Sequence, residues 1–145
     1  MNEKVKVSCL QCGATNAYPV PDGGKTVVCG RCKTALPKPG QVLEPQADKV
    51  VGLIQNAALP ILLDFYSPTC MPCHMMHPVL DGLAKRRAGD LMILRVNSDR
   101  NLELASEFRI KAVPTFVVMK KGFEIGRMSG ALNETDFSLW VASKA

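Results

Sequence analysis

Apolar and polar positions follow regular spacings from residue 48 onward, and these spacings predict helices and strands. Two nearly continuous apolar runs, 61–66 and 91–96, are typical of strands buried on both faces of a sheet. Between them, apolar residues recur at helical spacing over 71–87. Two further apolar runs around a Lys-Lys-Gly turn predict a hairpin. The predicted elements are helix 48–58, strand 61–66, helix 71–87, strand 91–96, helix 102–108, strands 115–119 and 124–128, and helix 134–142 with Asn133 as its N-cap.

This order of elements predicts an α/β domain, in which helical crossovers join parallel strands before an antiparallel hairpin. With 47% hydrophobic and 21% charged residues, the composition is that of a globular protein. Every apolar stretch is far shorter than the roughly 20 residues needed to cross a bilayer, so no membrane partner is predicted. The charged first seven residues lack the apolar core of a secretory signal. We therefore expect a cytoplasmic protein, whose paired cysteines hold metal or cycle catalytically rather than form structural disulfides.

All six cysteines occur in three Cys-x-x-Cys pairs, and the first two pairs differ in setting from the third. Sixteen residues separate the first two pairs, which fits the spacing of a four-cysteine zinc site. Gly13 and Gly30 are predicted to supply the flexible backbone of its two turns. Because no other ligand type lies nearby, we expect one closed, structural Zn²⁺ on which this small module depends. The predicted ligands are Cys9, Cys12, Cys29 and Cys32.

A Pro- and Gly-rich stretch over 35–40 marks a change of composition and predicts a boundary. We predict a zinc-ribbon module over 1–36, a linker over 37–41 and a second domain over 42–145, with separate cores. Residues 1–40 carry six basic and two acidic side chains, a charge of +4 that four zinc-bound thiolates would lower to +2. A zinc ribbon that binds nucleic acid is the competing interpretation. It is disfavoured because Tyr18 is the only aromatic residue before Phe65.

The third pair lies where the strand 61–66 gives way to a helix. At the helix start, Cys70 would face unpaired amide donors and the positive end of the helix dipole, which favour its thiolate. One turn later, Cys73 is close enough to form a disulfide and is the predicted resolving thiol. Pro72 is tolerated in the first turn. The pair could instead be inert or half of a metal site, but the other four cysteines leave it without a partner pair.

Four blocks stand out from about residue 42 to the end: Asp64-Phe65-Tyr66-Ser67-Pro68-Thr69-Cys70-Met71-Pro72-Cys73, then Pro78, Val113-Pro114-Thr115 and Gly130-Ala131. Together they resemble the thioredoxin family. Differences lie at Tyr66 and Thr69, where the family usually has Trp, at Met71, where it has Gly, and at His74, which replaces a common Lys. The N-terminal zinc ribbon resembles that of the zinc-binding bacterial thioredoxins.

The resemblance implies a thioredoxin fold, a central mixed sheet flanked by helices, and a protein-disulfide reductase with a redox-active Cys70–Cys73 disulfide. It implies that Asp64 is a buried acid that exchanges a proton with Cys73, its pKa raised by desolvation. It further implies that Pro114 is cis, that disulfide-containing client proteins and thioredoxin reductase are the partners, and that the protein is a monomer. His74 and His77 are expected on a satisfied or exposed helix face, not at a metal. The implied client-binding residues are Met71, Pro72, Val113, Pro114 and Gly130.

Overall fold

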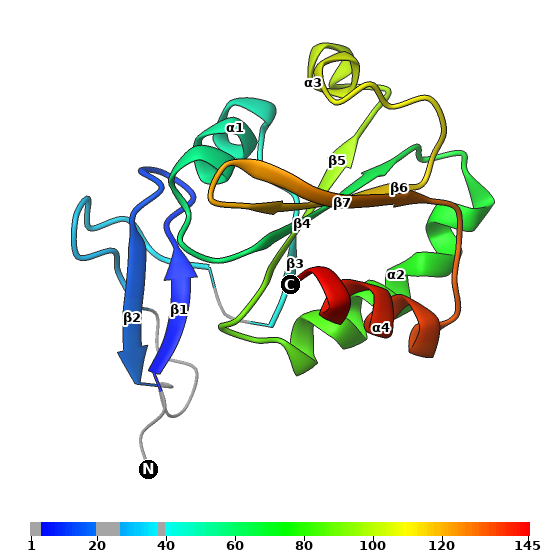
Figure 1. The fold of residues 1–145 in the computed structure, drawn as a ribbon. Coiled ribbons are helices and arrows are strands. Elements are labelled where there is room, and N and C mark those ends of the chain that lie inside the picture. Colours follow the sequence, from blue (N-terminus) through cyan, green and yellow to red (C-terminus); the bar gives the residue numbers. More distant parts are fainter. Residues whose placement is uncertain (1–3, 20–26, 38–39) are drawn as a thin grey trace.

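The computed structural model describes residues 4–19, 27–37 and 40–145, so part of the predicted 37–41 linker lies outside the described residues. The elements after this linker are β3 (Val42–Leu43), α1 (Ala47–Asn56), β4 (Ile61–Tyr66), α2 (Met71–Arg86), β5 (Met92–Asn97), α3 (Leu102–Glu107), β6 (Thr115–Lys120), β7 (Phe123–Ser129) and α4 (Glu134–Lys144). Their strands form one mixed sheet in the order β3-β5-β4-β6-β7 (Figure 1). β3, β5 and β4 run parallel, and β6 and β7 each run antiparallel to a neighbour.

Each element predicted from residue 48 onward is present, with bounds that differ by at most two residues. The short strand β3 was not predicted, because two residues are too few to show a periodicity. It pairs with β5 at the edge of the sheet, where Val42 lies opposite Ile93. The formation of β3 therefore depends on its pairing with β5 rather than on a pattern in its own sequence.

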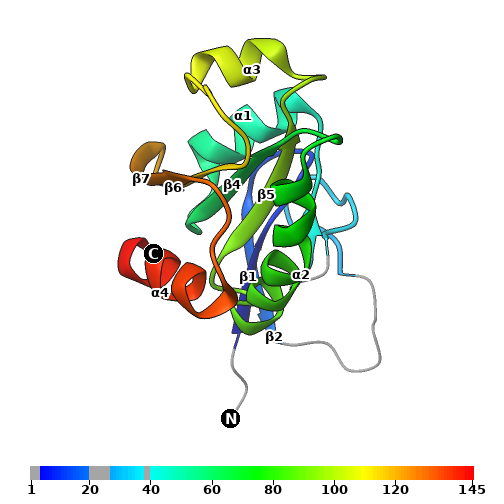
Figure 2. The same ribbon diagram turned by 90° about the vertical axis from the view of Figure 1, so that its right-hand side faces the viewer.

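Strand β4 lies in the middle of the sheet, and all six of its residues are buried. Because side chains alternate along a strand, its residues serve two different cores. Ile61, Leu63 and Phe65 pack with α1 and α3 on one face, whereas Leu62 packs with α2 and α4 on the other. Figures 1 and 2 show the resulting three layers, with the sheet between the two pairs of helices. Asp64 lies two residues after Leu62, so its side chain points to the same face of the sheet, toward α2.

Helix α2 carries the third cysteine pair at its N-terminal end. Cys70 is its N-cap, Pro72 lies in its first turn, and Pro78 lies inside it. The helix turns Met76 toward the sheet, whereas Met75 is 65% exposed. Consecutive helical positions are about 100° apart, so Met75 and Met76 point to different sides of the helix.

The N-terminal segment forms a hairpin that the sequence did not predict, with β1 (Lys4–Ser8) antiparallel to β2 (Thr15–Pro19). The loop between the strands carries the first cysteine pair, and Gly13 adopts a left-handed backbone there with φ +78°. In the second pair the equivalent position is Lys33, with φ 65°, and Gly30 is not left-handed. The expected role of Gly30 is corrected accordingly: the residue after each pair, not the residue within it, makes the special turn.

The N-terminal segment has a small apolar cluster, in which Val7 and Leu36 pack with two buried cysteines. The segment is not isolated, because Leu10 packs against the core between the sheet and α1. In addition, the Ala58 backbone N–H donates to Thr15 Oγ1 at 3.1 Å. The N-terminal cluster is thus distinct from the two cores of the sheet, but the first cysteine loop lies against the end of α1.

Candidate active site and metal centre

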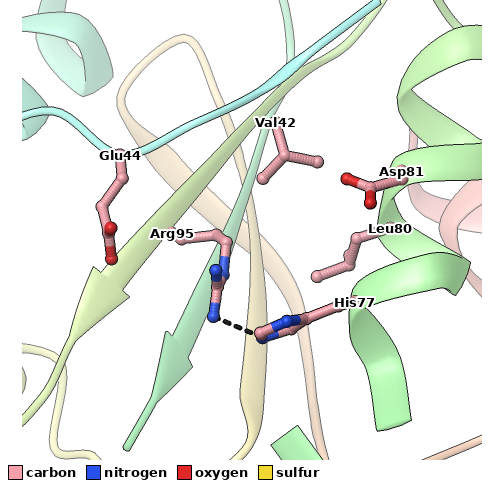
Figure 3. Close-up of a pocket in the computed structure, with 6 residues that line it drawn as sticks. All are labelled: Val42, Glu44, His77, Leu80, Asp81 and Arg95. Carbon is pink, nitrogen blue, oxygen red and sulfur yellow. Dashed lines mark hydrogen bonds between the residues drawn. The ribbon is translucent and has the colours of Figure 1, made fainter. Parts of the chain in front are cut away.

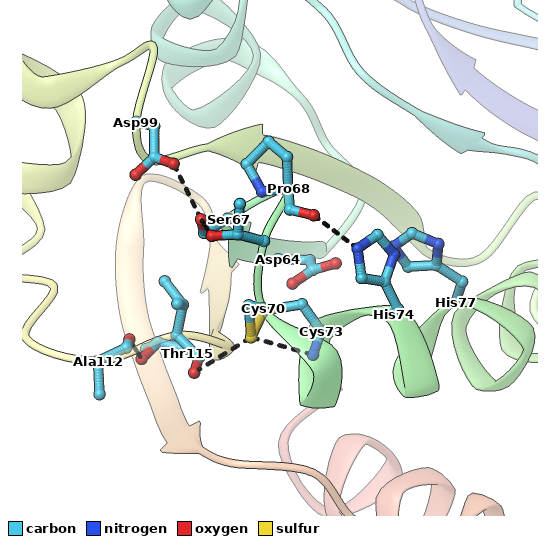
Figure 4. Close-up of a disulfide and its surroundings, with 12 residues drawn as sticks. Asp64, Ser67, Pro68, Cys70, Cys73, His74, His77, Asp99, Ala112 and Thr115 are labelled. Carbon is cyan, nitrogen blue, oxygen red and sulfur yellow. Dashed lines mark hydrogen bonds between the residues drawn. A yellow bond between two sulfur atoms is a disulfide. The ribbon is translucent and has the colours of Figure 1, made fainter.

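Cys70 and Cys73 form a disulfide at the start of α2, with their Cα atoms 5.3 Å apart (Figure 4). Cys70 is half-buried, and its extended backbone as the N-cap turns its sulfur toward the first helical turn. There the Cys73 backbone N–H donates to Cys70 Sγ at 3.2 Å. Cys73 is only 1% exposed. Of the two sulfurs, that of Cys70 is therefore the one that another molecule can reach.

The loop that precedes Cys70 is held by polar side chains from two other elements (Figure 4). Ser67 Oγ donates to Asp99 Oδ2 at 2.9 Å, which ties the end of β4 to the loop after β5. His74 Nε2 bonds the Pro68 carbonyl oxygen at 2.7 Å across the start of the helix. The expectation that His74 lies on an exposed, satisfied helix face is confirmed. These contacts fix the loop that leads from β4 into Cys70.

The segment around Pro114 faces the cysteine pair. The Val113–Pro114 peptide bond is cis, as the resemblance implied. The Val113 carbonyl oxygen lies 3.7 Å from Cys70 Sγ, and the Gly130 N–H donates to the Pro114 carbonyl oxygen at 2.9 Å. Thr115 Oγ1 donates to the Ala112 carbonyl oxygen at 2.6 Å. The predicted client-binding positions 113, 114 and 130 therefore lie in two loops that are bonded to each other beside Cys70.

The remaining two predicted client-binding residues, Met71 and Pro72, are exposed next to the disulfide. Met71 is 71% exposed, and Met75 one turn later is also exposed. Both sulfur-containing side chains are flexible and apolar, which suits contact with varied partners. The exposed position of Met75, one turn from Met71, became apparent only in the structure.

Asp64 is the buried acid of the site, with 1% of its surface exposed. Burial raises its pKa from 3.8 to about 6, and the nearby charge of Arg95 opposes this shift. Arg95 Nε lies 3.5 Å from Asp64 Oδ2, but neither carboxylate oxygen has a hydrogen-bond partner within the described part of the chain. A carboxyl group with a pKa near neutrality can both accept and return a proton.

Arg95 was not singled out from the sequence, although a signal was present. It is the one charged residue in the apolar run 91–96, as Asp64 is in the run 61–66. The parallel register of β4 and β5 places these two residues opposite each other. Arg95 also contacts Tyr66, whose ring centroid lies 4.0 Å from the guanidinium carbon, and it donates to His77 Nε2. His77 is thus a satisfied histidine, as expected.

The four N-terminal cysteines gather into one cluster whose sulfur atoms all lie within 4.8 Å of one another. Two cross-pairs are closest, at 3.5 Å for Cys9–Cys32 and 3.6 Å for Cys12–Cys29. A tetrahedral ion with metal–sulfur bonds of about 2.3 Å would set sulfur–sulfur distances near 3.8 Å, so the set fits such an ion. Backbone N–H groups of Gln11 and Arg31, and the Asn16 amide, point to these sulfurs at 3.3–3.5 Å, as is common for thiolate ligands. The predicted ligands are thus positioned together to bind a metal ion.

Comparison with known proteins agrees with this geometry. A family model described as thioredoxin matches residues 41–143. Thioredoxin C-3 from Corynebacterium nephridii is 31% identical over 135 residues, which cover 93% of this chain and 92% of that protein. Thioredoxin from Haemophilus influenzae is 37% identical over 90 residues, or 62% of this chain and 84% of that protein. A solved structure of a mutant thioredoxin from Halobacterium salinarum has a TM-score of 0.67 and 27% identity, covering 74% of this chain and 94% of its own.

The match to Thioredoxin C-3 spans nearly the whole chain and therefore extends into the segment that carries the four clustered cysteines. Among the described residues, no helix is both long and apolar enough to cross a membrane. The expected thioredoxin fold is confirmed by the family match and the structural superposition. With the disulfide at the start of α2 and a thioredoxin match over most of its length, the chain belongs to the thioredoxin family and is a thiol-disulfide oxidoreductase.

Proposed function

We propose that this chain is a protein-disulfide reductase that cycles the Cys70–Cys73 pair through a mixed disulfide with client proteins. The observation that carries the proposal is the contrast between the two sulfurs, one reachable at a helix N-terminus and the other 1% exposed one turn later. A nucleophile must be accessible and ionised, and a resolving thiol must be close but protected. The pair meets both requirements.

In the first step, the Cys70 thiolate attacks one sulfur of the client disulfide. A bond forms between Cys70 Sγ and that sulfur, the client disulfide breaks, and the second client sulfur leaves as a thiolate that takes up a proton. The Cys73 N–H and the positive end of α2 stabilise the Cys70 thiolate before attack. The two loops that carry Val113 and Gly130 are the proposed groove for the extended client backbone, with Met71 and Pro72 on its opposite side.

In the second step, Asp64 accepts the proton of the Cys73 thiol, and the resulting thiolate attacks Cys70 Sγ. The Cys70–Cys73 bond forms, the mixed disulfide breaks, and the client leaves fully reduced with two electrons that came from the pair. The pKa of about 6 supports this role for Asp64, because the group is mostly ionised at neutral pH and remains basic enough to take a proton. Thioredoxin reductase is the proposed source of the two electrons that restore the dithiol.

We further propose that the ion held by the four clustered cysteines is Zn²⁺, one per chain, in a module over 1–36 that a linker over 37–41 joins to the domain over 42–145. Four thiolates in a compact tetrahedral set are the donor type that zinc prefers in structural sites. The bound ion would cross-link the two cysteine loops, and no redox step passes through it. Thiolate ligands stay reduced in the cytoplasm, which is the compartment we propose.

Reduction of insulin by dithiothreitol, followed as turbidity, tests the proposed function. The wild-type protein should accelerate precipitation of the insulin B chain, whereas a Cys70→Ser variant should match the rate with dithiothreitol alone. A Cys32→Ser variant that is still folded over 42–145 should keep the acceleration, because its cysteine belongs to the metal set. Equal rates for wild type and Cys70→Ser would reject the reductase.

A further inference from the structure

Arg95 is surrounded by groups that hold its guanidinium away from the buried carboxyl group of Asp64. Its Nη2 donates to His77 Nε2 on α2, and its guanidinium stacks on the ring of Tyr66. The Tyr66 hydroxyl in turn donates to a Glu44 carboxylate oxygen. Although Asp64 is its nearest acid, Arg95 offers that carboxylate only Nε, at 3.5 Å and without hydrogen-bond geometry. A guanidinium normally makes short, two-pronged bonds to a carboxylate, so this arrangement is held by the other partners.

Two cavities beside Arg95 are consistent with this position of its guanidinium. It lines a cavity of about 240 Å³ together with His77 and Glu44, and Figure 3 shows the bond between Arg95 and His77 along one side of it. A second cavity of about 310 Å³, which Tyr66 also lines, lies against Arg95 and Glu44 as well. Each is large enough for several water molecules. Arg95 therefore borders both cavities, whereas Asp64 lines neither of them.

The surroundings of His77 lower its pKa and so favour the neutral ring that this bond requires. Arg95 carries only donors, so His77 Nε2 must be unprotonated to accept. Burial lowers the pKa of His77, and the positive charges of Arg95 and His74 lower it further, while Asp81 and Glu44 oppose them. The charged or titrating groups that face this network are Glu44 before α1, Asp64 and Tyr66 on β4, His74, His77 and Asp81 on α2, and Arg95 on β5.

We propose that His77 is a positioning residue for the buried acid: by accepting a hydrogen bond from Arg95, it keeps the guanidinium from bonding Asp64. The acid then retains a proton affinity suited to exchange with Cys73, which rests on the proposed function. Without His77, the guanidinium is free to turn and donate directly to Asp64. A direct charge-assisted bond would favour the carboxylate and make it a weaker base.

The test compares His77→Ala with His77→Gln, whose side-chain oxygen can still accept from Arg95 but cannot titrate. The first readout is the carboxylic acid band of Asp64 in infrared difference spectra from pH 4 to 8, identified by its loss in Asp64→Asn. In His77→Ala the titration of this band should move to lower pH by about one unit. In His77→Gln it should stay at the wild-type pH. An unmoved or upward-shifted titration in His77→Ala overturns the proposal, and so does a Gln variant that behaves like Ala.

The second readout is the single-turnover rate of client reduction against pH. In His77→Ala, the acidic limb of the rate–pH profile should move to lower pH. If His77 acts through Asp64, this shift should be absent when His77→Ala is combined with Asp64→Asn. Asp81→Asn is the matched control, since Asp81 lines the same cavity one turn later on the same helix. It should leave the limb in place. If the wild type reduces no client, the proposed function fails, but the infrared titration still tests the role of His77.

Discussion

The Cys73 backbone N–H donates a hydrogen bond of 3.2 Å to the sulfur of Cys70, so the proposed resolving residue itself contacts the proposed nucleophile. The bond exists because Cys70 is the N-cap of α2, and a cap side chain accepts from the amide three residues later. In the dithiol state the same amide would stabilise a thiolate more than a thiol. The two cysteines are therefore unequal before any client arrives.

The first prediction concerns the order of alkylation in the reduced protein. Near neutral pH, iodoacetamide should modify Cys70 roughly tenfold or more faster than Cys73, since Cys70 is more exposed and its thiolate is stabilised. Peptide mass mapping after short exposures measures both sites. Faster modification of Cys73 would reverse the assigned roles.

The second prediction concerns trapping of clients. Cys73→Ser removes the resolving thiol but leaves the attacking one, so it should accumulate mixed disulfides through Cys70. Cys70→Ser should accumulate none, because the remaining Cys73 is buried. Non-reducing gels with a purified disulfide-containing client, run for both variants, provide the comparison. Trapping by Cys70→Ser alone would contradict the mechanism.

The third prediction concerns the pH dependence of stability. The folded-state pKa of Asp64, about 6, lies above its ordinary value of 3.8, so the folded protein binds this proton more tightly than the unfolded chain. The stabilisation is complete below pH 3.8 and is lost as the pH rises through 6. At pH 7 an Asp64→Asn variant should therefore be more stable by up to roughly 3 kcal/mol, and its client reduction should be slower.

Urea unfolding of wild type and Asp64→Asn at several pH values between 4 and 8 measures this difference. Only the difference between the two proteins is diagnostic, because other groups titrate in both. A gap in unfolding free energy that stays constant with pH would show that Asp64 does not titrate as expected. Unchanged reduction rates across neutral pH would remove it from the mechanism.

The fourth prediction concerns the metal. The purified chain should contain one equivalent of zinc, and a Cys9→Ser/Cys12→Ser variant should contain almost none. Removal of the ion should unfold residues 1–36, whose described part has only a small apolar cluster of its own, while the mixed sheet stays folded. Metal analysis and hydrogen exchange measure the two effects. Full zinc content in the variant, or loss of protection throughout 42–145 on chelation, would refute the prediction.

The fifth prediction concerns the contact between the metal loop and the core beside α1. Leu10 packs there from the loop between β1 and β2, and Leu10→Ala should lower the unfolding free energy of the main domain by about 1 kcal/mol. Zinc content should stay at one equivalent, because Leu10 is not a ligand. Gln11→Ala is the matched control: its side chain is exposed, and its backbone bond to Cys9 Sγ is retained. An equal loss of stability in both variants would show that the packing of Leu10 does not itself stabilise the main domain.

Local patterns were sufficient to predict most elements after residue 47, the pairing of Cys70 with Cys73 and the clustering of the other four cysteines. The run 61–66, the N-cap at Asn133 and the cysteine spacings each depend on residues close in sequence. In such cases the hydrogen bonds or ligands are specified by a few neighbouring positions. An error occurred where two neighbouring positions were ambiguous: Gly30 lies within the second cysteine pair, and Lys33 directly follows it.

The sequence by itself therefore determined the α/β order, the cysteine pair at a helix start and the four-cysteine set. Only the tertiary structure decided what surrounds Asp64. Its position opposite Arg95 requires the parallel register of two strands that a whole helix separates, and the bond from Arg95 to His77 requires that same helix to pack on them. Likewise, Leu10 contacts the main core only because the hairpin folds back onto α1. Register and packing of distant segments are set by the sum of many weak, non-local contacts, which no short stretch of sequence encodes.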